Sequence, residues 1–267
     1  LDVKFQLQKI KSSVIEQTTI KSNTLKETLE NFEKYKDSTY SVAWIDCTAK
    51  GNNIGRSLLM LGEHSTNETL HIPKKRKLKV PFYFPHFVLN HYSIKVFNFL
   101  YFNKMQKKET QQKVGINTFF YPLDGIDNWN RMYGKKGFIQ YQFVLPIEQC
   151  FVGLTKILAK IAASGKGSFL AVLKLLGKNN DNYLSFPMKG ITLALDFKLE
   201  DDLFLLLEQL DDIVLECKGR FYLAKDARVD KKTFELGYPE IELFRGLRGK
   251  YKMDNKLQSI QSIRLGL

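Results

Sequence analysis

Phe138-Ile139-Gln140-Tyr141-Gln142-Phe143-Val144 alternates apolar and polar side chains, the pattern of a β-strand with one buried and one wet face. After it, the chain predicts a helix over 147–163, strands over 168–176 and 191–197, a helix over 200–216 and a short strand over 220–223. The link over 177–190 is too short for a helical crossover between parallel strands. The sequence therefore predicts an α+β fold, in which a large, mostly antiparallel sheet has helices packed on one face.

The N-terminal half predicts further strands and one clearly marked helix. Thr24 to Glu27 fits a capping box, and Leu25, Leu29 and Phe32 then share one helical face. The other expected elements are one or two strands within 1–22, beginning with the alternating stretch 1–7, strands over 40–46 and 56–61, a helix within 87–101, a polar, mobile stretch over 104–112 and a helical tail from residue 233.

Positive charge is concentrated in one segment of the chain. There are 41 Lys and Arg against 28 Asp and Glu, a formal net charge of +13. Residues 71–113 hold nine lysines, one arginine and nine aromatic residues but a single acid, Glu109, so they supply +9 of that total. Such a segment is typical of a nucleic-acid groove, a membrane-surface element or a loop over an anionic substrate. Three cysteines are too few for a disulfide framework, and no apolar run reaches the roughly 18 residues of a membrane span.

Polar side chains on three predicted strands can share one face of the sheet. Gln140 and Gln142 lie on one side of their strand, and Thr192 and Asp196 lie on one side of theirs. If the strand that carries Lys174 is a neighbour, these five side chains line one surface. Such a face is either simply solvated, as antiparallel sheets commonly are, or a binding surface for a hydroxyl-rich ligand. The residue pattern alone leaves both interpretations open.

Longer motifs carry a family resemblance. The stretches FYPLDGIDNWNRMYG (120–134) and GFIQYQFVLP (137–146) closely resemble decaprenylphosphoryl-β-D-ribose 2′-oxidases and their wider bacterial relatives. Those proteins are FAD-dependent oxidases of the vanillyl-alcohol-oxidase superfamily. The resemblance covers the whole chain, with further matches at 40–47, 168–177, 184–187, 192–197 and 219–228.

This resemblance implies three parts of the chain. Residues 1–22 correspond to the end of an FAD-binding domain, 23–228 to the cap or substrate-binding domain with an insertion at 71–113, and 229–267 to a C-terminal tail. The family binds FAD through a Gly-rich pyrophosphate loop, which this sequence lacks. We therefore expect the isolated chain to bind FAD weakly or not at all and to be inactive alone. The start at Leu1 within an alternating pattern likewise predicts a piece of a longer protein.

The resemblance also implies roles for individual residues. In the family, a sugar hydroxyl carbon gives its hydride to the flavin, over which the wet face of the cap sheet lies. Lys225 is implied as the catalytic residue, close to flavin and substrate, and Tyr222 as a second contact to the cofactor. No metal is expected. Together with the sheet-face pattern, the resemblance implies the substrate-binding residues Phe120, Gln140, Gln142, Lys174, Thr192 and Asp196.

The leading hypothesis is the substrate-binding part of an FAD-dependent oxidoreductase that acts on the CH–OH group of a sugar, namely a polyprenyl-phosphate pentose used for the cell wall. The alternative is a sugar-1,4-lactone oxidase of the D-arabinono-1,4-lactone oxidase type, and a remote alternative is a non-enzymatic nucleic-acid-binding module. A polyprenyl phosphate supplies both an anion and a hydrocarbon tail, so the segment 71–113 favours the first hypothesis. We expect this segment to be a mobile lid at a membrane surface, the protein to be cytoplasmic or peripheral at the inner face of the membrane, and an epimerising reductase to be a partner.

Overall fold

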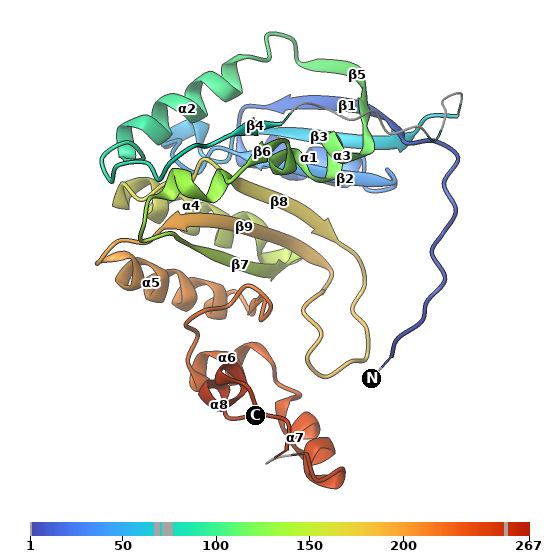
Figure 1. Cartoon of the computed structure of the whole chain (residues 1–267), viewed down its shortest axis with the longest axis vertical. Coiled ribbons are helices and arrows are strands. Elements are labelled where there is room, and N and C mark those ends of the chain that lie inside the picture. The colour runs from blue at the N-terminus through green and yellow to red at the C-terminus, as the bar shows by residue number, and fades with distance from the viewer. Residues whose placement is uncertain (1, 67–69, 71–76, 254–255) are drawn as a thin grey trace.

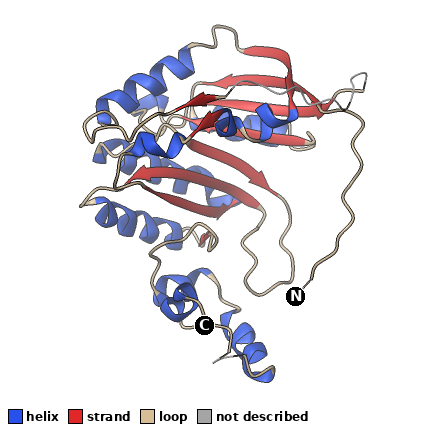
Figure 2. Ribbon diagram, in the orientation of Figure 1, coloured by secondary structure: helices blue, strands red, loops and turns tan. Residues whose placement is uncertain are grey.

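The computed structural model describes residues 2–66, 70, 77–253 and 256–267. Its centre is an eight-stranded antiparallel sheet with the strand order β10-β7-β9-β8-β2-β3-β1-β5 (Figures 1 and 2). This sheet and its surrounding helices confirm the predicted α+β fold. The strands of this sheet are β1 (Val14–Ser22), β2 (Tyr40–Ile45), β3 (Ser57–His64), β5 (Glu109–Gly115), β7 (Phe138–Pro146), β8 (Ala171–Leu176), β9 (Gly190–Lys198) and β10 (Arg220–Phe221).

Three helices bury the main core against one face of the sheet. They are α1 (Leu25–Lys34), α4 (Cys150–Ser164) and α5 (Leu203–Glu216), and their apolar sides join the inward-facing residues of the strands in one cluster. Gly165 ends α4 in the left-handed conformation (φ 74°), which glycine adopts without steric cost.

The start of α1 follows the predicted capping box in part. The Thr24 hydroxyl accepts a hydrogen bond from the backbone N–H of Glu27 at 3.1 Å. The Glu27 carboxylate, however, accepts from the backbone N–H of Asn23 at 2.8 Å rather than from that of Thr24. The two bonds still satisfy two backbone donors at the start of α1, one just before the helix and one in its first turn.

A fourth helix, α2 (His91–Asn103), packs on the opposite face of the sheet. There Phe102 joins a separate cluster with Trp44 and Leu58, which alternate along β2 and β3 with residues of the main core. Asn98 is fully buried at this contact, and its amide donates to the Asp46 carboxylate at 2.9 Å and to the Ser168 carbonyl at 3.3 Å. The helix predicted within 87–101 is thus present and is fixed to the sheet.

Among the strands of this sheet that are longer than two residues, β2 and β8 have the shortest ladder. These two strands pair only at Ala43 with Leu173 and at Trp44 with Val172. By contrast, β7 and β9 pair over nine residues, and β2 and β3 over six. The eight strands therefore form two groups of four, β10-β7-β9-β8 and β2-β3-β1-β5, which are joined by a short ladder.

Two predictions about local structure are wrong. The alternating stretch 1–7 predicted a strand, yet residues 2–10 are irregular and exposed. Val3, Phe5 and Leu7 are at least 76% exposed, so the apolar side of this pattern has no core to pack against. Residues 104–112 were predicted to be polar and mobile, yet 109–115 form β5, the edge strand of the sheet. In addition, β1 lies before the expected domain boundary at residue 22 and belongs to the same sheet as the strands after it.

The remaining elements are short or lie at the C-terminal end. Figure 1 shows α6–α8 as a group at the end of the molecule remote from α2. No helix in the described part of the chain is both long and apolar enough to span a bilayer. These elements are β4 (Leu78–Lys79), which pairs in parallel with β6 (Ile126–Asp127), α3 (Ile116–Phe120), α6 (Lys231–Gly237), α7 (Ile241–Lys250), α8 (Ile260–Leu265) and the 3-10 turns Gly51–Asn53, Pro122–Gly125, Trp129–Tyr133 and Ile147–Gln149.

Candidate functional site

The predicted polar residues do share one face of the sheet. The strands β7, β9 and β8 are neighbours, and their register places Gln140 opposite Asp196 and Lys174 opposite Thr192. Gln142 lies opposite Ala194, between these two pairs. The five side chains therefore form one continuous strip across three strands.

Burial divides this strip into two layers. Lys174 is exposed, and Gln140 and Gln142 are half-buried. Thr192 and Asp196, in contrast, are only 2% and 4% exposed. Each of these two buried groups accepts a hydrogen bond from one of the glutamines, Asp196 from Gln140 and Thr192 from Gln142. Their direct contact with substrate stays a prediction.

A chain of hydrogen bonds connects the buried carboxylate to the surface. Gln140 donates from Nε2 to Oδ1 of Asp196 at 3.0 Å. Its Oε1 accepts a hydrogen bond from Nζ of Lys225 at 2.7 Å. The anion on one side and the cation on the other fix which way the Gln140 amide is turned, since the amide can donate only from nitrogen and accept only at oxygen. Lys225 is exposed, so its ammonium retains donors for a ligand.

The turn after β10 brings Lys225 and Tyr222 to this position. The backbone N–H of Tyr222 donates to the Gln142 carbonyl at 2.9 Å, and that of Lys225 donates to the Tyr222 carbonyl at 2.9 Å. The Tyr222 ring packs against Phe186, with 4.7 Å between ring centroids. The two predicted cofactor contacts are thus held beside the two glutamines of β7.

Asp196 is the electrostatically unusual group of the strip. Burial raises the pKa of its carboxyl to about 6, against the opposing effects of the Gln140 hydrogen bond and the Lys225 charge. Within the described part of the chain, neither its Oδ2 nor the buried hydroxyl of Tyr133 has a hydrogen-bond partner. Burial, and then the charge of Asp196, also raise the pKa of Tyr133, which keeps that hydroxyl protonated. Asp196 therefore carries its negative charge at neutral pH at a cost in folding free energy.

Gln142 is held by its own buried partner. Its Nε2 donates to the Thr192 hydroxyl at 3.1 Å, and that hydroxyl donates onward to the Phe143 carbonyl at 2.8 Å. No residue in the described ranges donates a hydrogen bond to Oε1 of Gln142. The Gln142 amide can therefore accept a hydrogen bond from a ligand hydroxyl.

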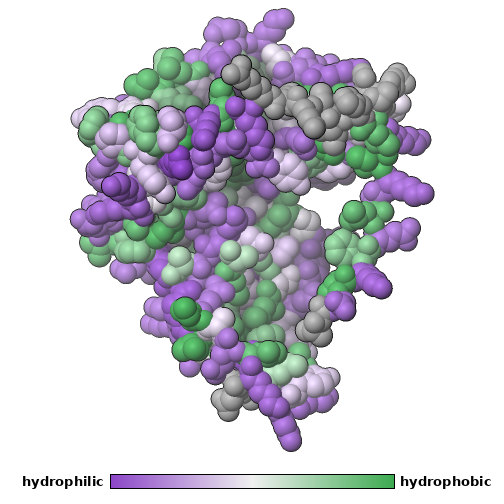
Figure 3. All heavy atoms as spheres, in the orientation of Figure 1, coloured by the Kyte–Doolittle hydropathy of each residue, from purple (hydrophilic) through white to green (hydrophobic). Residues whose placement is uncertain are grey.

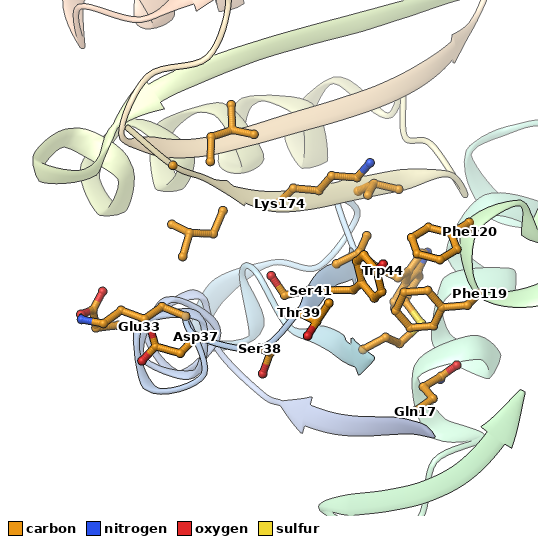
Figure 4. Close-up of a pocket in the computed structure, with 18 of the residues that line it drawn as sticks. Gln17, Glu33, Asp37, Ser38, Thr39, Ser41, Trp44, Phe119, Phe120 and Lys174 are labelled. Carbon is orange, nitrogen blue, oxygen red and sulfur yellow. The ribbon is translucent and has the colours of Figure 1, made fainter. Parts of the chain in front are cut away.

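A large pocket opens where the ladder between β2 and β8 ends (Figure 4). Its volume is about 1020 Å³, and its walls include the predicted residues Phe120 and Lys174. The Phe120 ring contacts the rings of Tyr40 and Phe119 edge-on, at 4.7 Å and 5.1 Å between centroids. Of the other predicted site residues, none lines this pocket. Lys174 stands at the border, since its partner across the ladder with β9 is Thr192.

The aromatic wall of this pocket contains residues that the sequence did not single out. Trp44 and Tyr101 line it, with 4.7 Å between their ring centroids, and the Trp44 indole N–H donates to the Phe169 carbonyl at 3.0 Å. The alternation along β2 does place Trp44 on one face with Val42. What the sequence did not show is that β2 lies beside β8, because the two strands are more than 120 residues apart in the chain.

Thiol chemistry has no place in this site. All three cysteines are buried and unpaired, and burial raises the pKa of Cys47 and of Cys150 to about 12. On β9, the residue opposite Gln142 is Ala194, which carries no reactive group.

Comparison with known proteins relates this sequence to a sugar oxidase. The chain is 33% identical over 238 residues to decaprenylphosphoryl-beta-D-ribose oxidase of Mycolicibacterium smegmatis, a match that covers 86% of this chain and 51% of the relative. It is 26% identical over 246 residues to an uncharacterized protein encoded in the mprA 5′ region of Streptomyces coelicolor, covering 86% of this chain and 66% of that protein. No family model matches the chain.

The chain spans about half the length of the first of these relatives. The predicted resemblance, which rested on the motifs at 120–134 and 137–146, is confirmed by this match. The chain is therefore related by sequence, along most of its length, to a part of decaprenylphosphoryl-beta-D-ribose oxidase.

Proposed function

We propose that this chain is the substrate-binding part of an FAD-dependent oxidoreductase that oxidises a hydroxyl group of a sugar, and that the sugar is a polyprenyl-phosphate pentose. The observation that carries the proposal is the chain of hydrogen bonds from Lys225 through Gln140 to Asp196, at the polar face of the sheet. The M. smegmatis relative is a decaprenylphosphoryl-beta-D-ribose oxidase, and this similarity supports a lipid-linked pentose as the substrate.

The residues at this face fit one side of a flavin, not the whole cofactor. Lys225 supplies a cation beside Gln140, and the backbone of Tyr222 is bonded to that of Gln142, so a cation and an aromatic ring lie next to the two glutamines. Such a set of side chains suits a flat ring with polar edges. The sequence contains no Gly-rich loop that would hold the FAD pyrophosphate. When bound, FAD supplies the acceptor for the hydride that leaves the sugar carbon.

In this proposal the side chains of the strip bind and orient the sugar. The Lys225 ammonium would donate to the substrate hydroxyl oxygen and stabilise the negative charge that this oxygen carries once its proton has passed to water, before the hydride leaves the carbon. Gln140 positions that ammonium, and Asp196 positions Gln140. Gln142 accepts from a neighbouring sugar hydroxyl through Oε1. Because these groups are already held by the protein, little reorganisation is needed when the substrate binds.

The pocket between β2 and β8 suits the other end of such a substrate. Lys174 stands between the polar strip and the pocket, where an ammonium can bind a phosphate as a point charge. The rings of Phe120, Trp44 and Tyr101 then offer an apolar wall to the first isoprene units. A lactone substrate has neither a phosphate nor a tail, so these features favour the polyprenyl phosphate over an aldonolactone.

The product of this oxidation is a keto-sugar that remains attached to the lipid. A reductase that returns hydride to the opposite face of the carbonyl would complete an epimerisation. We propose such an enzyme as the partner in the reaction sequence.

The test uses the natural protein that contains this chain, loaded with FAD and mixed without oxygen with one substrate at a time. We expect flavin absorbance to bleach with a polyprenyl-phosphate pentose and to stay unchanged with an aldono-1,4-lactone. Bleaching by the lactone alone would assign the alternative function, and bleaching by neither would contradict the proposal.

A further inference from the structure

Helix α2 has apolar side chains on two opposite sides. One side, with Ile94, Asn98 and Phe102, is buried against the sheet. The other side is solvent-exposed and is also apolar at helical spacing. The exposed fractions on that side are 76% for Tyr92, 58% for Val96, 55% for Phe99 and 61% for Leu100. An exposed apolar helix face of this kind marks an interaction surface.

Apolar residues just before the helix extend this surface. Phe87 is 73% exposed, and its carbonyl accepts a hydrogen bond from the side chain of Asn90, the residue that caps α2. Val88 is exposed beside it in the chain. Figure 3 shows hydrophobic residues at the surface in the upper left, where Figure 1 places α2.

The charge around this face has a single sign. Residues 77–108 contain six lysines and no acidic residue. Lys77 pairs with Asp127 at 3.4 Å, and Lys108 pairs with Glu27 at 3.3 Å. The remaining four lysines, Lys79, Lys95, Lys104 and Lys107, are exposed. Of these, Lys95 lies within α2, and Lys104 caps its C-terminus.

We propose that α2 is a docking surface for an anionic lipid bilayer, in which the helix lies flat with Tyr92, Val96, Phe99 and Leu100 inserted at the headgroup level. Exposed aromatic and aliphatic residues in a segment, 77–108, that holds six lysines and no acidic residue have the composition of an interfacial helix, and each lysine adds attraction to anionic lipid. An acidic protein surface would match the lysines but not the continuous apolar face between them.

Helix α2 already has the conformation that docking to a bilayer requires. Asn98 anchors it to Asp46 and Ser168, and Phe102 is buried beneath it, so the exposed face is presented on a fixed helix. A preorganised helix avoids the entropy cost of folding at the membrane. Tyr101 of the same helix lines the large pocket, so docking would bring that pocket close to the bilayer. This consequence rests on the proposed function, whereas the docking itself does not.

The test measures partition of the full 267-residue chain into vesicles by sedimentation. One set is phosphatidylcholine alone, and the other contains about a third phosphatidylglycerol. We expect clear binding to the anionic vesicles, and at least about tenfold weaker binding for Val96→Ser/Phe99→Ser/Leu100→Ser. Lys95→Glu should weaken binding to anionic vesicles by about fivefold or more.

The matched control is Phe151→Ser/Val152→Ser on α4, which removes two apolar side chains that are each 51% exposed on the other side of the sheet. It should bind as the unchanged chain does. Equal binding of the α2 triple variant and the unchanged chain would overturn the proposal, as would equal binding to both vesicle types. If the unchanged chain binds no vesicles but forms a dimer that the triple variant abolishes, α2 contacts a second copy instead. None of these outcomes depends on flavin or on turnover.

Discussion

The two ends of the candidate site are built differently on the same face of one sheet. At the polar end, β7 and β9 pair over nine residues and hold Gln140 and Asp196 in hydrogen-bonded register. At the aromatic end, β2 and β8 pair over only two residues, and a pocket of about 1020 Å³ opens beside Phe120. The long ladder between β7 and β9 thus holds polar side chains in fixed positions, whereas the short ladder between β2 and β8 leaves room for a pocket. We infer that the first end sets the rate of the chemistry and the second sets affinity for the substrate's tail.

After the loss of Lys225 itself, the largest effect is expected from Gln140→Ala at the polar end. This change removes the group that joins Lys225 to Asp196 and leaves Asp196 Oδ1 without its donor. We expect the rate of flavin reduction by substrate to fall by about a hundredfold, the size typical for loss of a preorganised polar group. Anaerobic stopped-flow absorbance of the natural protein measures this rate. A change in substrate affinity alone would contradict the assignment.

Asp196→Asn is expected to change stability with pH. Because burial raises the pKa of Asp196 to about 6, the ionised carboxylate opposes folding. The folded chain is therefore most stabilised by this group at low pH, and the free energy of unfolding falls as the pH rises from about 4 through 6. The asparagine variant avoids this cost, so we expect it to be more stable at pH 8 by on the order of 2 kcal/mol.

Urea denaturation at pH 5 and pH 8 measures this difference. The variant should still lose some free energy of unfolding as the pH rises, because burial also raises the pKa of Asp211 to about 6. The Asp211 carboxylate accepts hydrogen bonds from Arg228 and Tyr141. An Asp196→Asn variant with unchanged stability at pH 8 would show that the carboxylate is not held in an apolar environment.

A smaller effect is expected from Phe120→Ala at the aromatic end. The ring is 38% exposed and contacts Tyr40 and Phe119, so its loss removes apolar surface from the pocket wall without opening the core. We expect affinity for the polyprenyl-linked sugar to weaken by about tenfold, while affinity for a short-chain analogue and the rate at saturation stay nearly constant. An equal loss of affinity for the polyprenyl-linked sugar and for the short-chain analogue would contradict the separate role of the aromatic end of the site.

The sequence predicted the polar strip well. The strip depends on the alternation of side chains along each strand, and the three strands that carry it are neighbours in the sheet. Gln140, Gln142 and Lys174 needed only the alternation and the order of β7, β9 and β8. It did not predict that Thr192 and Asp196 are buried. That burial depends on non-local packing such as the position of Tyr133, whose segment shows no periodic pattern.

The lysine-rich segment 71–113 was harder to interpret, because its structure also depends on contacts with residues far away in the chain. Residues 104–112 are polar at nearly every position, which predicted a mobile stretch, yet 109–115 form an edge strand in which residues 109–113 are exposed. Lysine and other polar residues are common on such edges because they discourage pairing with other chains. The helix within the segment was predicted, but its attachment through Asn98 was not, because the partners of Asn98 lie about 50 and 70 residues away in the chain. Residues 71–76 of the segment fall outside the described residues.

The most direct test of the central claim is the rate of flavin reduction in Lys225→Ala. The natural protein, loaded with FAD and mixed anaerobically with a polyprenyl-phosphate pentose, is compared with this variant and with Lys160→Ala. The control removes a half-buried lysine of α4 whose ammonium donates to Gln209, on the other face of the sheet. The account predicts a reduction rate that is lower by about a hundredfold or more in Lys225→Ala and unchanged in Lys160→Ala. Equal rates in the unchanged protein and in Lys225→Ala would contradict it.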